Sequence, residues 1–329
     1  MTEGFENTND SKKDIEIINE VVCDYIYNSE SITEIEDIVL MEKLTDILLN
    51  TKEVYYNFRD KHKYSFKKNN KIVENFLESL SSNYKEYYKI RIIDGSFEFD
   101  EETSEKDFPF NCYDPIDKKR IIYIPLKNTL EDSFAIVHEL MHDINLDINN
   151  HNLIRNFYTE SLSILCEMLL DDYLGKNNTK GYKNNMDYSL FVFKSKAIAV
   201  NLNIKLIKAY LDKGYIDEYT LDEIILSYPE EYDEDLFMNL YKIKEDEELN
   251  IEEEQPYIIG CLIAAYMYDR IKSNKYNLME LFELNQMLKY YNFDQVLDYL
   301  DLDYNEIDLE PSAYKKLEEK YKKYLKSRW

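Results

Sequence analysis

Glycine and proline are scarce in this chain of 329 residues, with only 6 of each. Chains built from many short strands need these residues at their turns, so their scarcity disfavours an all-β protein. The chain is long enough to bury a sizeable core and to form one large domain or two ordinary ones. A mainly α-helical protein is therefore expected.

Positive charge is also in short supply. The chain carries 40 Lys and Arg against 66 Asp and Glu, which gives a formal net charge of -26. Binding to a phosphate backbone needs clustered basic residues, so nucleic acid is excluded as an expected partner, whereas neutral or basic peptides are easier partners. No stretch approaches the roughly 18 uninterrupted apolar residues of a membrane span, and the chain does not start like a secretory signal. A soluble, cytoplasmic protein without a membrane partner is expected.

Cysteines are few and widely separated in the sequence. The four are Cys23, Cys112, Cys166 and Cys261. Disulfide-stapled small domains and thiolate zinc sites both need closely spaced cysteines, so neither is expected. All four are predicted to be reduced thiols in the core.

Hydrophobic periodicity predicts helices along most of the chain. Residues 1–12 are polar and are expected to be disordered. Helices are predicted from residue 15, over 32–58, 70–88, 130–149, 153–174, 186–213, 220–228, 234–245, 256–273, 278–291 and 312–326. The acidic run at 244–255 has no apolar face and predicts a solvated linker or lid.

Two stretches in the first half of the chain predict β-structure. KIRIIDGSFEFD, at 89–100, alternates apolar and polar residues around an Asp-Gly pair, which is typical of a β-hairpin. RIIYIP, at 120–125, is β-branched and aromatic and stops at a proline, which predicts a further strand. A small sheet is therefore expected just before the helix at 130–149.

That helix carries a metal-binding pattern. Residues 135–144 read AIVHELMHDI, so His138 and His142 lie four apart and Glu139 follows the first. Positions four apart share a helix face, so both imidazoles can converge on one ion while Glu139 projects toward a bound water. In zinc metallopeptidases that glutamate accepts a proton from the water. With only four histidines, such a pattern would arise by chance in roughly one such chain in a hundred.

A zinc site of this kind needs a third protein ligand. His151 follows in an Asn-rich turn, where exposure is expected. The next helix, FYTESLSILCEMLLDDYL, offers Glu160 and Glu167. These two share a helix face but lie about 10.5 Å apart along it, so only one can bind the ion. The other can accept a hydrogen bond from a ligating histidine, and both can instead be ordinary solvent-facing glutamates.

Three stretches resemble the thimet oligopeptidase and oligoendopeptidase F family of zinc metallopeptidases. NTLEDSFAIVHELMH (128–142) is similar to the family's turn and HExxH helix. TESLSILCE (159–167) matches the family's Glu-x-Pro-Ser-x-x-x-Glu pattern in both glutamates and in Ser163, with Leu162 in place of the proline. QPYIIGCLIAAYMYDRI (255–271) is similar to the family's C-terminal Tyr-Ala-x-Gly helix.

The resemblance implies a helical, zincin-like fold of the gluzincin type that binds one zinc ion. His138, His142 and Glu160 are then the ligands, and Glu139 is the general base. Glu167 takes the remaining role of hydrogen-bond partner to a ligating histidine.

The resemblance also implies how substrates bind. It predicts a deep channel that admits short unfolded peptides and excludes folded proteins. The strand at 120–125 would be the sheet edge on which the peptide backbone pairs.

The chain departs from the family in two places. Met141 stands where the family has glycine, and no histidine follows His151, whereas the family's C-terminal loop supplies His and Tyr donors to the oxyanion. Tyr257 is the best remaining candidate donor, with Tyr232 and Tyr228 as weaker ones. The chain is also shorter than typical members, which predicts a more open channel or one closed by a second copy.

The sequence therefore predicts a zinc-dependent endopeptidase that hydrolyses short peptides. The predicted organisation is a disordered tail (1–12), an N-terminal helical region (13–88), a catalytic metallopeptidase domain (89–310) and a C-terminal helix (311–329). Two alternatives remain open. The first is a weak or inactive peptidase-like protein with a peptide-binding or regulatory role, and the second is a helical scaffold without a metal.

Overall fold

The chain is mainly α-helical and divides into two compact units. The computed structural model describes residues 8–28, 35–51, 62–101, 108–114, 119–145, 153–249, 251–273 and 311–328. The first unit combines residues 1–52 with 192–258, and the second combines residues 53–191 with 259–329. Two long helices, α7 (Tyr182–Lys213) and α10 (Ile251–Lys272), contribute residues to both units. The predicted helix at 278–291 and His151 lie outside the described residues.

The described part of the first unit is helical. It consists of α1 (Thr8–Asn28), α2 (Ile35–Leu49), the second part of α7, α8 (Glu218–Leu226), the 3-10 helix η1 (Glu230–Tyr232), α9 (Asp233–Asp246) and the start of α10. The amide of Asn19 ties α1 to the segment before α8, because it accepts from the N–H of Ile216 at 2.7 Å and donates to its carbonyl at 2.8 Å. Since α1 begins at Thr8, part of the segment expected to be disordered is helical.

The acidic run at 244–255 is largely helical, so the prediction of a solvated linker is wrong. It forms the end of α9 and the start of α10, and the turn between them carries Leu249. Leu249 and Ile251 are only 6% and 5% exposed. These two apolar side chains anchor the run to the unit, although most of its acidic residues are exposed.

The second unit contains helices and the small sheet. Its elements are α3 (Phe66–Leu80), α4 (Ser82–Ile93), β1 (Phe97–Asp100), β2 (Phe110–Asp114), β3 (Lys119–Pro125), α5 (Glu131–Asn145), α6 (Leu153–Lys176), the first part of α7, the rest of α10, and α14 (Pro311–Arg328). The guanidinium of Arg328 attaches α14 to the unit through ion pairs with the buried Asp171 and Asp187. No helix in the described part of the chain is long and apolar enough to cross a membrane.

The sheet has the strand order β1-β3-β2. β3 runs parallel to β1 and antiparallel to β2. The strand predicted at 120–125 is confirmed as β3, but it is the central strand and not an edge, so the predicted peptide-pairing edge is wrong. Among the described residues β2 pairs with β3 alone and forms the edge. The sequence signal for β2 was weak, because FNCYD has no alternating apolar pattern.

The hairpin predicted at 89–100 is also wrong. Residues 82–93 form α4, in which Tyr84 and Tyr88 are buried one turn apart. Gly95, at φ +72°, adopts the left-handed conformation that commonly ends a helix, and the chain then enters β1. The Asp-Gly pair is therefore a helix terminus and not a hairpin turn.

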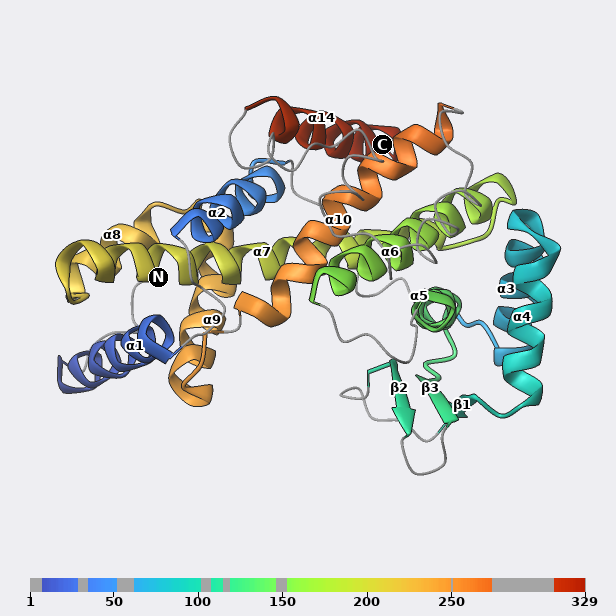
Figure 1. Cartoon of the computed structure of the whole chain (residues 1–329), viewed down its shortest axis with the longest axis horizontal. Helices are drawn as coiled ribbons and strands as arrows, with labels where there is room; N and C mark the ends of the chain where they lie inside the picture. The colour runs from blue at the N-terminus through green and yellow to red at the C-terminus, as the bar shows by residue number, and fades with distance from the viewer. Residues whose placement is uncertain are drawn as a thin grey trace. The chain divides into compact units, whose positions relative to one another are not determined.

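Helix α5 packs against four other elements of the second unit. It contacts α6, α3, β3 and β2, and Figure 1 shows it nearly end-on with the sheet on one side. Ile122 and Ile124 of β3 are fully buried, as are Val137 and Leu140 of α5. The prediction of a mainly helical fold with a small sheet beside the HExxH helix is confirmed.

The cysteines are free thiols. Cys166 and Cys261 are fully buried, as predicted, and burial raises the pKa of both thiols. Cys23 is half-buried, and Cys112 is exposed on β2. The prediction of a core position is therefore wrong for Cys112, because edge strand β2 is largely exposed.

Candidate metal centre

Helix α5 presents the two histidines of the motif on a partly buried face. Phe134, Val137 and Met141 of the same helix are buried in the core. Because His138 and His142 are four residues apart, their rings lie on one face, with Nε2 atoms 3.0 Å apart. Met141, which replaces the glycine of the resembled family, is part of this core.

Helix α6 brings a carboxylate to the same point. Glu160 Oε1 lies 3.2 Å from His142 Nε2, and Glu160 Oε2 lies 3.5 Å from His138 Nε2. One potential ligand atom from each of the three side chains lies within 4.8 Å of the others, so the group could hold a metal ion. Two imidazole nitrogens and one carboxylate oxygen are ligands that suit zinc and other transition metals.

Two details of the polar contacts fit a metal at this position. Glu160 Oε2 is buried and has no hydrogen-bond partner among the described residues beyond the 3.5 Å ion-pair contact with His138 Nε2, and a buried carboxylate oxygen is costly unless a cation lies close to it. His138 Nδ1 contacts Glu167 Oε1 at 2.6 Å. If Nδ1–H donates to this carboxylate, the Nε2 lone pair points toward the cluster, as a ligating histidine requires.

Glu167 belongs to a longer chain of hydrogen bonds. Ser189, on α7, donates from Oγ to Glu167 Oε2 at 3.0 Å. Ser163 Oγ donates to the carbonyl of His138 at 3.1 Å. The ring and the backbone of His138 are thus both held, one through Glu167 and the other through Ser163. Ser189 was missed by the sequence analysis, since nothing local connects it to a residue 22 positions away.

The charges at the cluster are strongly coupled. Burial lowers the pKa of His138, but hydrogen bonds to Glu160 and Glu167 outweigh burial and raise it well above its usual value. Burial raises the pKa of the Glu160 carboxyl, while the charge of His142 and hydrogen bonds from both histidines hold it well below its usual range. The histidines and glutamates of the cluster therefore attract one another electrostatically.

A close helix contact determines where Glu160 can lie. Gly260, on α10, faces α6 so closely that a Cβ atom there would meet Glu160 Cβ at 3.0 Å and the backbone nitrogen of Ser161 at 3.3 Å. Such distances leave no room for a side chain without displacement of α6. The absence of a side chain at position 260 is thus part of the geometry of the cluster.

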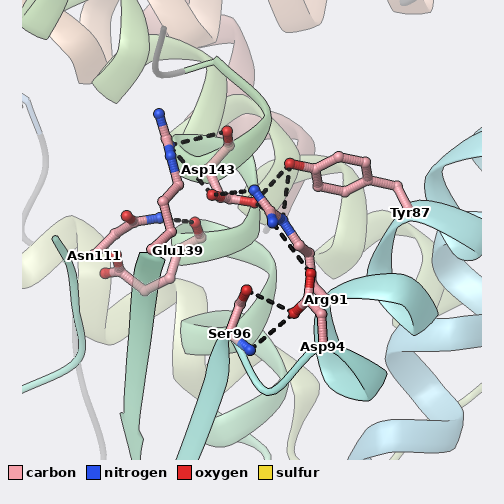
Figure 2. A network of polar contacts seen from close by, with 8 residues as sticks. Tyr87, Arg91, Asp94, Ser96, Asn111, Glu139 and Asp143 are labelled. Carbon is pink, nitrogen blue, oxygen red and sulfur yellow. Dashed lines mark hydrogen bonds and ion pairs between the residues drawn. The ribbon is translucent and has the colours of Figure 1, made fainter. Parts of the chain in front are cut away.

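Glu139 is the acid between the two histidines. Its side chain is buried, with 6% of the residue exposed, and its carboxylate has no hydrogen-bond or ion-pair partner in the described part of the chain. Asn111 of β2 donates from Nδ2 to the carbonyl of Glu139 at 3.2 Å (Figure 2). This bond, which the sequence did not predict, attaches the edge strand to the middle of α5.

Both ends of α5 are held by buried aspartates. At the start, Asp132 accepts from the backbone N–H groups of Lys127 and Asn128 and from the amide of Asn69. At the end, Asp143 accepts from Arg91, Arg120 and Tyr87, as Figure 2 shows for the two labelled partners. Neither aspartate was singled out from the sequence.

The tyrosines considered as oxyanion donors all belong to the first unit. Tyr228 donates to Asn201 at 2.7 Å, and Tyr232 donates to the carbonyl of Leu49 at 3.1 Å. Both are buried and act as core residues there. Tyr257 is half-buried, and the ammonium of Lys196 lies 4.2 Å from the centroid of its ring. The role predicted for Tyr257 stays a prediction.

Comparison with known proteins gives a likeness of fold. A crystal structure from Chlamydophila abortus, described as that of a "putative peptidase", matches with a TM-score of 0.54 and 17% sequence identity. The match covers 97% of this chain but only 56% of that one, so this chain spans about half the length of its structural neighbour. No family model matches the sequence. No curated protein matches it either.

Proposed function

We propose that this protein is a zinc-dependent endopeptidase of the gluzincin type, which hydrolyses short peptides and resembles the thimet oligopeptidase and oligoendopeptidase F enzymes. The observation that carries the proposal is the convergence of Glu160 with His138 and His142, in which a buried oxygen of Glu160 has no hydrogen-bond partner among the described residues. Its fold resembles that of a structure described as a "putative peptidase", which supports the same conclusion.

The proposed roles follow from the contacts of each side chain. A zinc ion supplies Lewis acidity, which polarises a peptide carbonyl and makes a water molecule more acidic. His138, His142 and Glu160 hold the ion, and Glu167 orients the ring of His138. Glu139, whose buried carboxylate has no described protein partner, accepts a proton from the attacking water and returns it to the leaving amine.

Edge strand β2 is the proposed binding site for the peptide backbone. Its outer edge has no strand partner among the described residues and can pair with an extended peptide, and Asn111 attaches the strand to the carbonyl of Glu139, next to the proposed general base. Phe110 and Tyr113 are 47% and 40% exposed on β2 and offer apolar surface to peptide side chains. Tyr257 is the proposed donor to the oxyanion.

Metal content and peptide turnover test the proposal. Wild-type protein is expected to hold about one zinc per chain and to cut unstructured peptides, and Glu139→Gln is expected to keep the metal but lose about 10²- to 10⁴-fold in rate. Glu131→Gln is the matched control, because it makes the same change on the same helix at a partly exposed site. Less than a tenth of a zinc per chain, with no turnover after zinc addition, would overturn the proposal.

The two rival functions predict different results. A peptidase-like protein that only binds peptides holds zinc, yet wild type and Glu139→Gln both turn peptides over at background rates. The absence of a histidine after His151 favours this rival. A helical scaffold without metal keeps the same melting temperature when a chelator is added, whereas a zinc protein loses stability.

A further inference from the structure

The two histidines of α5 differ in how their rings are held. The ring of His138 is held at Nδ1 by Glu167, which in turn accepts from Ser189. The ring of His142 contacts Glu160 and His138 through Nε2, and its Nδ1 has no partner among the described residues. The position of His142 therefore depends on the backbone of α5 at that point.

That backbone is fixed by the next residue, Asp143, whose side chain is 0% exposed. Its Oδ2 accepts from Arg91 Nε at 2.7 Å and from Tyr87 at 2.7 Å, and its Oδ1 accepts from Arg91 Nη2 and Arg120 Nη1 at 3.2 Å each. Arg120 Nη1 also donates to the backbone carbonyl of Asp143 at 3.2 Å. Figure 2 shows Tyr87 and Arg91 reaching Asp143 from α4.

These contacts hold the Asp143 carboxylate from two directions, and we call them the clamp. Arg91 and Tyr87 come from α4, and Arg120 comes from the central strand β3, so the carboxylate is held from two separate elements. Charge-assisted bonds to a planar guanidinium are strong and fix orientation as well as distance. Arg120 is only 7% exposed, which shields its bonds from water. The last turn of α5 thus has little freedom to rotate or shift.

We propose that Asp143 is a positioning residue of the metal centre, which acts through the backbone to hold His142 Nε2 in place for the ion. The inference rests on the proposed function, because it assumes that His142 binds a metal. It goes further by assigning separate supports to the two histidines. His138 is oriented through its ring, whereas His142 is oriented through the turn that Asp143 clamps.

A merely structural role for Asp143 would predict a loss of stability with no specific effect on metal binding. Asp132 provides the matched control, because it is a buried aspartate on the same helix with its own set of hydrogen bonds. It lies at the far end of α5 from His142. The substitutions Asp143→Asn and Asp132→Asn therefore make the same chemical change at two ends of one helix.

The experiment measures zinc affinity of the full-length, metal-free protein by competition with a chromogenic zinc chelator. We expect Asp143→Asn to bind zinc about 10- to 100-fold more weakly than wild type, the usual effect of losing an outer-shell support, and Asp132→Asn to remain within about threefold. The visible absorption of the Co²⁺-loaded protein is expected to change for Asp143→Asn alone, because the geometry at the ion changes.

A second pair of variants covers the case in which Asp143→Asn fails to fold. Arg91 is 23% exposed, so Arg91→Met removes only the outer part of the clamp. We expect it to weaken zinc binding severalfold, while Lys89→Met, which removes an exposed charge from the same helix, leaves binding unchanged. Failure of the wild type to bind zinc overturns the proposed function and this inference together. Equal zinc affinities for wild type and both clamp variants overturn this inference alone.

Discussion

The two ends of α5 are anchored by the same residue type in different electrostatic surroundings. Asp132, 2% exposed, accepts hydrogen bonds from neutral groups, which are two backbone N–H groups and the amide of Asn69. Asp143, 3% exposed, is paired with the cations of Arg91 and Arg120. A negative charge at the start of a helix and positive charges near its end both interact favourably with the helix dipole. Asp132 supplies the first of these in α5, and Arg91 and Arg120 supply the second.

The comparison shows that the negative charge of a buried aspartate can either cost or contribute stability, depending on the groups around it. Burial raises the pKa of Asp132 to about 6, since the hydrogen bonds from Lys127, Asn128 and Asn69 only partly offset the loss of water. At the other end, removing Asp143 would leave two guanidinium groups without their buried counter-ion. A neutral side chain is therefore expected to be tolerated in place of Asp132, whereas the negative charge of Asp143 is needed at the end of α5.

The largest expected effect follows from removing the charge at the end of α5. Asp143→Ala is expected to lower the free energy of unfolding by about 3 to 5 kcal/mol, because it removes the buried counter-ion that Arg91 and Arg120 share. Urea denaturation followed by circular dichroism measures the loss. Asp94→Ala is the control, because Asp94 also pairs with Arg91 but is 39% exposed, so a loss of about 1 to 2 kcal/mol is expected, which comes mainly from its hydrogen bonds with Ser96. Equal losses for both variants would contradict the comparison.

A pH series sharpens the contrast at the start of the helix. The pKa of Asp132 is raised to about 6 in the folded protein, against about 4 in an unfolded chain. The contribution of the protonated Asp132 carboxyl to stability is therefore fully present below about pH 4 and is lost as the pH rises through 6. Relative to Asp132→Asn, wild type is expected to lose about 1 to 3 kcal/mol between pH 4 and 7. If the difference in the free energy of unfolding between the two proteins stays constant over this range, the charge of Asp132 does not destabilise the folded protein.

The smallest effect concerns the neutral network behind Asp132. Ser133 donates from Oγ to Asn69 Oδ1 at 3.0 Å, and Asn69 in turn donates to Asp132. Ser133→Ala is expected to lower the free energy of unfolding by about 0.5 to 1.5 kcal/mol, the net value of one hydrogen bond. Thermal and urea unfolding measure this change, with zinc affinity expected to stay as in wild type. If Ser133→Ala lowers the free energy of unfolding as much as Asp143→Ala does, the ion pairs at the end of α5 are no more stabilising than the neutral hydrogen bonds at its start.

The parts of the site that the sequence could predict are those with local spacing. His138 and His142 are placed on one face by the helical repeat alone, and Glu160 was proposed from its place on the following helix and from the family resemblance. β3 was predicted from its β-branched residues. In each case the information lies within a few neighbouring residues, so no distant partner is needed to interpret it.

The errors arose where one local signal fits two structures. An Asp-Gly pair suits a hairpin turn and a helix end equally well, and the burial of Tyr84 and Tyr88 one turn apart decides for the helix at Gly95. β2 carries exposed residues and acquires its strand form through pairing with β3. Tertiary contacts, which are burial for α4 and strand pairing for β2, decided the two outcomes.

The supports of the site could not be predicted for a related reason. Arg91 lies 52 residues from Asp143, and Asn111 lies 28 residues from Glu139. A chain with 66 acidic residues offers very many pairings of this kind. Only the fold selects which arginine meets which carboxylate.

Gly260 is a sequence feature that the geometry of the metal centre requires, although it lies outside the HExxH motif. Since a Cβ atom there would press on Glu160 and on the backbone of Ser161, a substitution at this position would move the third ligand without touching it. Distant relatives that bind metal in this way should therefore retain a glycine on the helix opposite that ligand, even where the surrounding residues have diverged. A search profile that pairs the HExxH helix with this glycine would separate metal-binding relatives from chains that share the helix by chance.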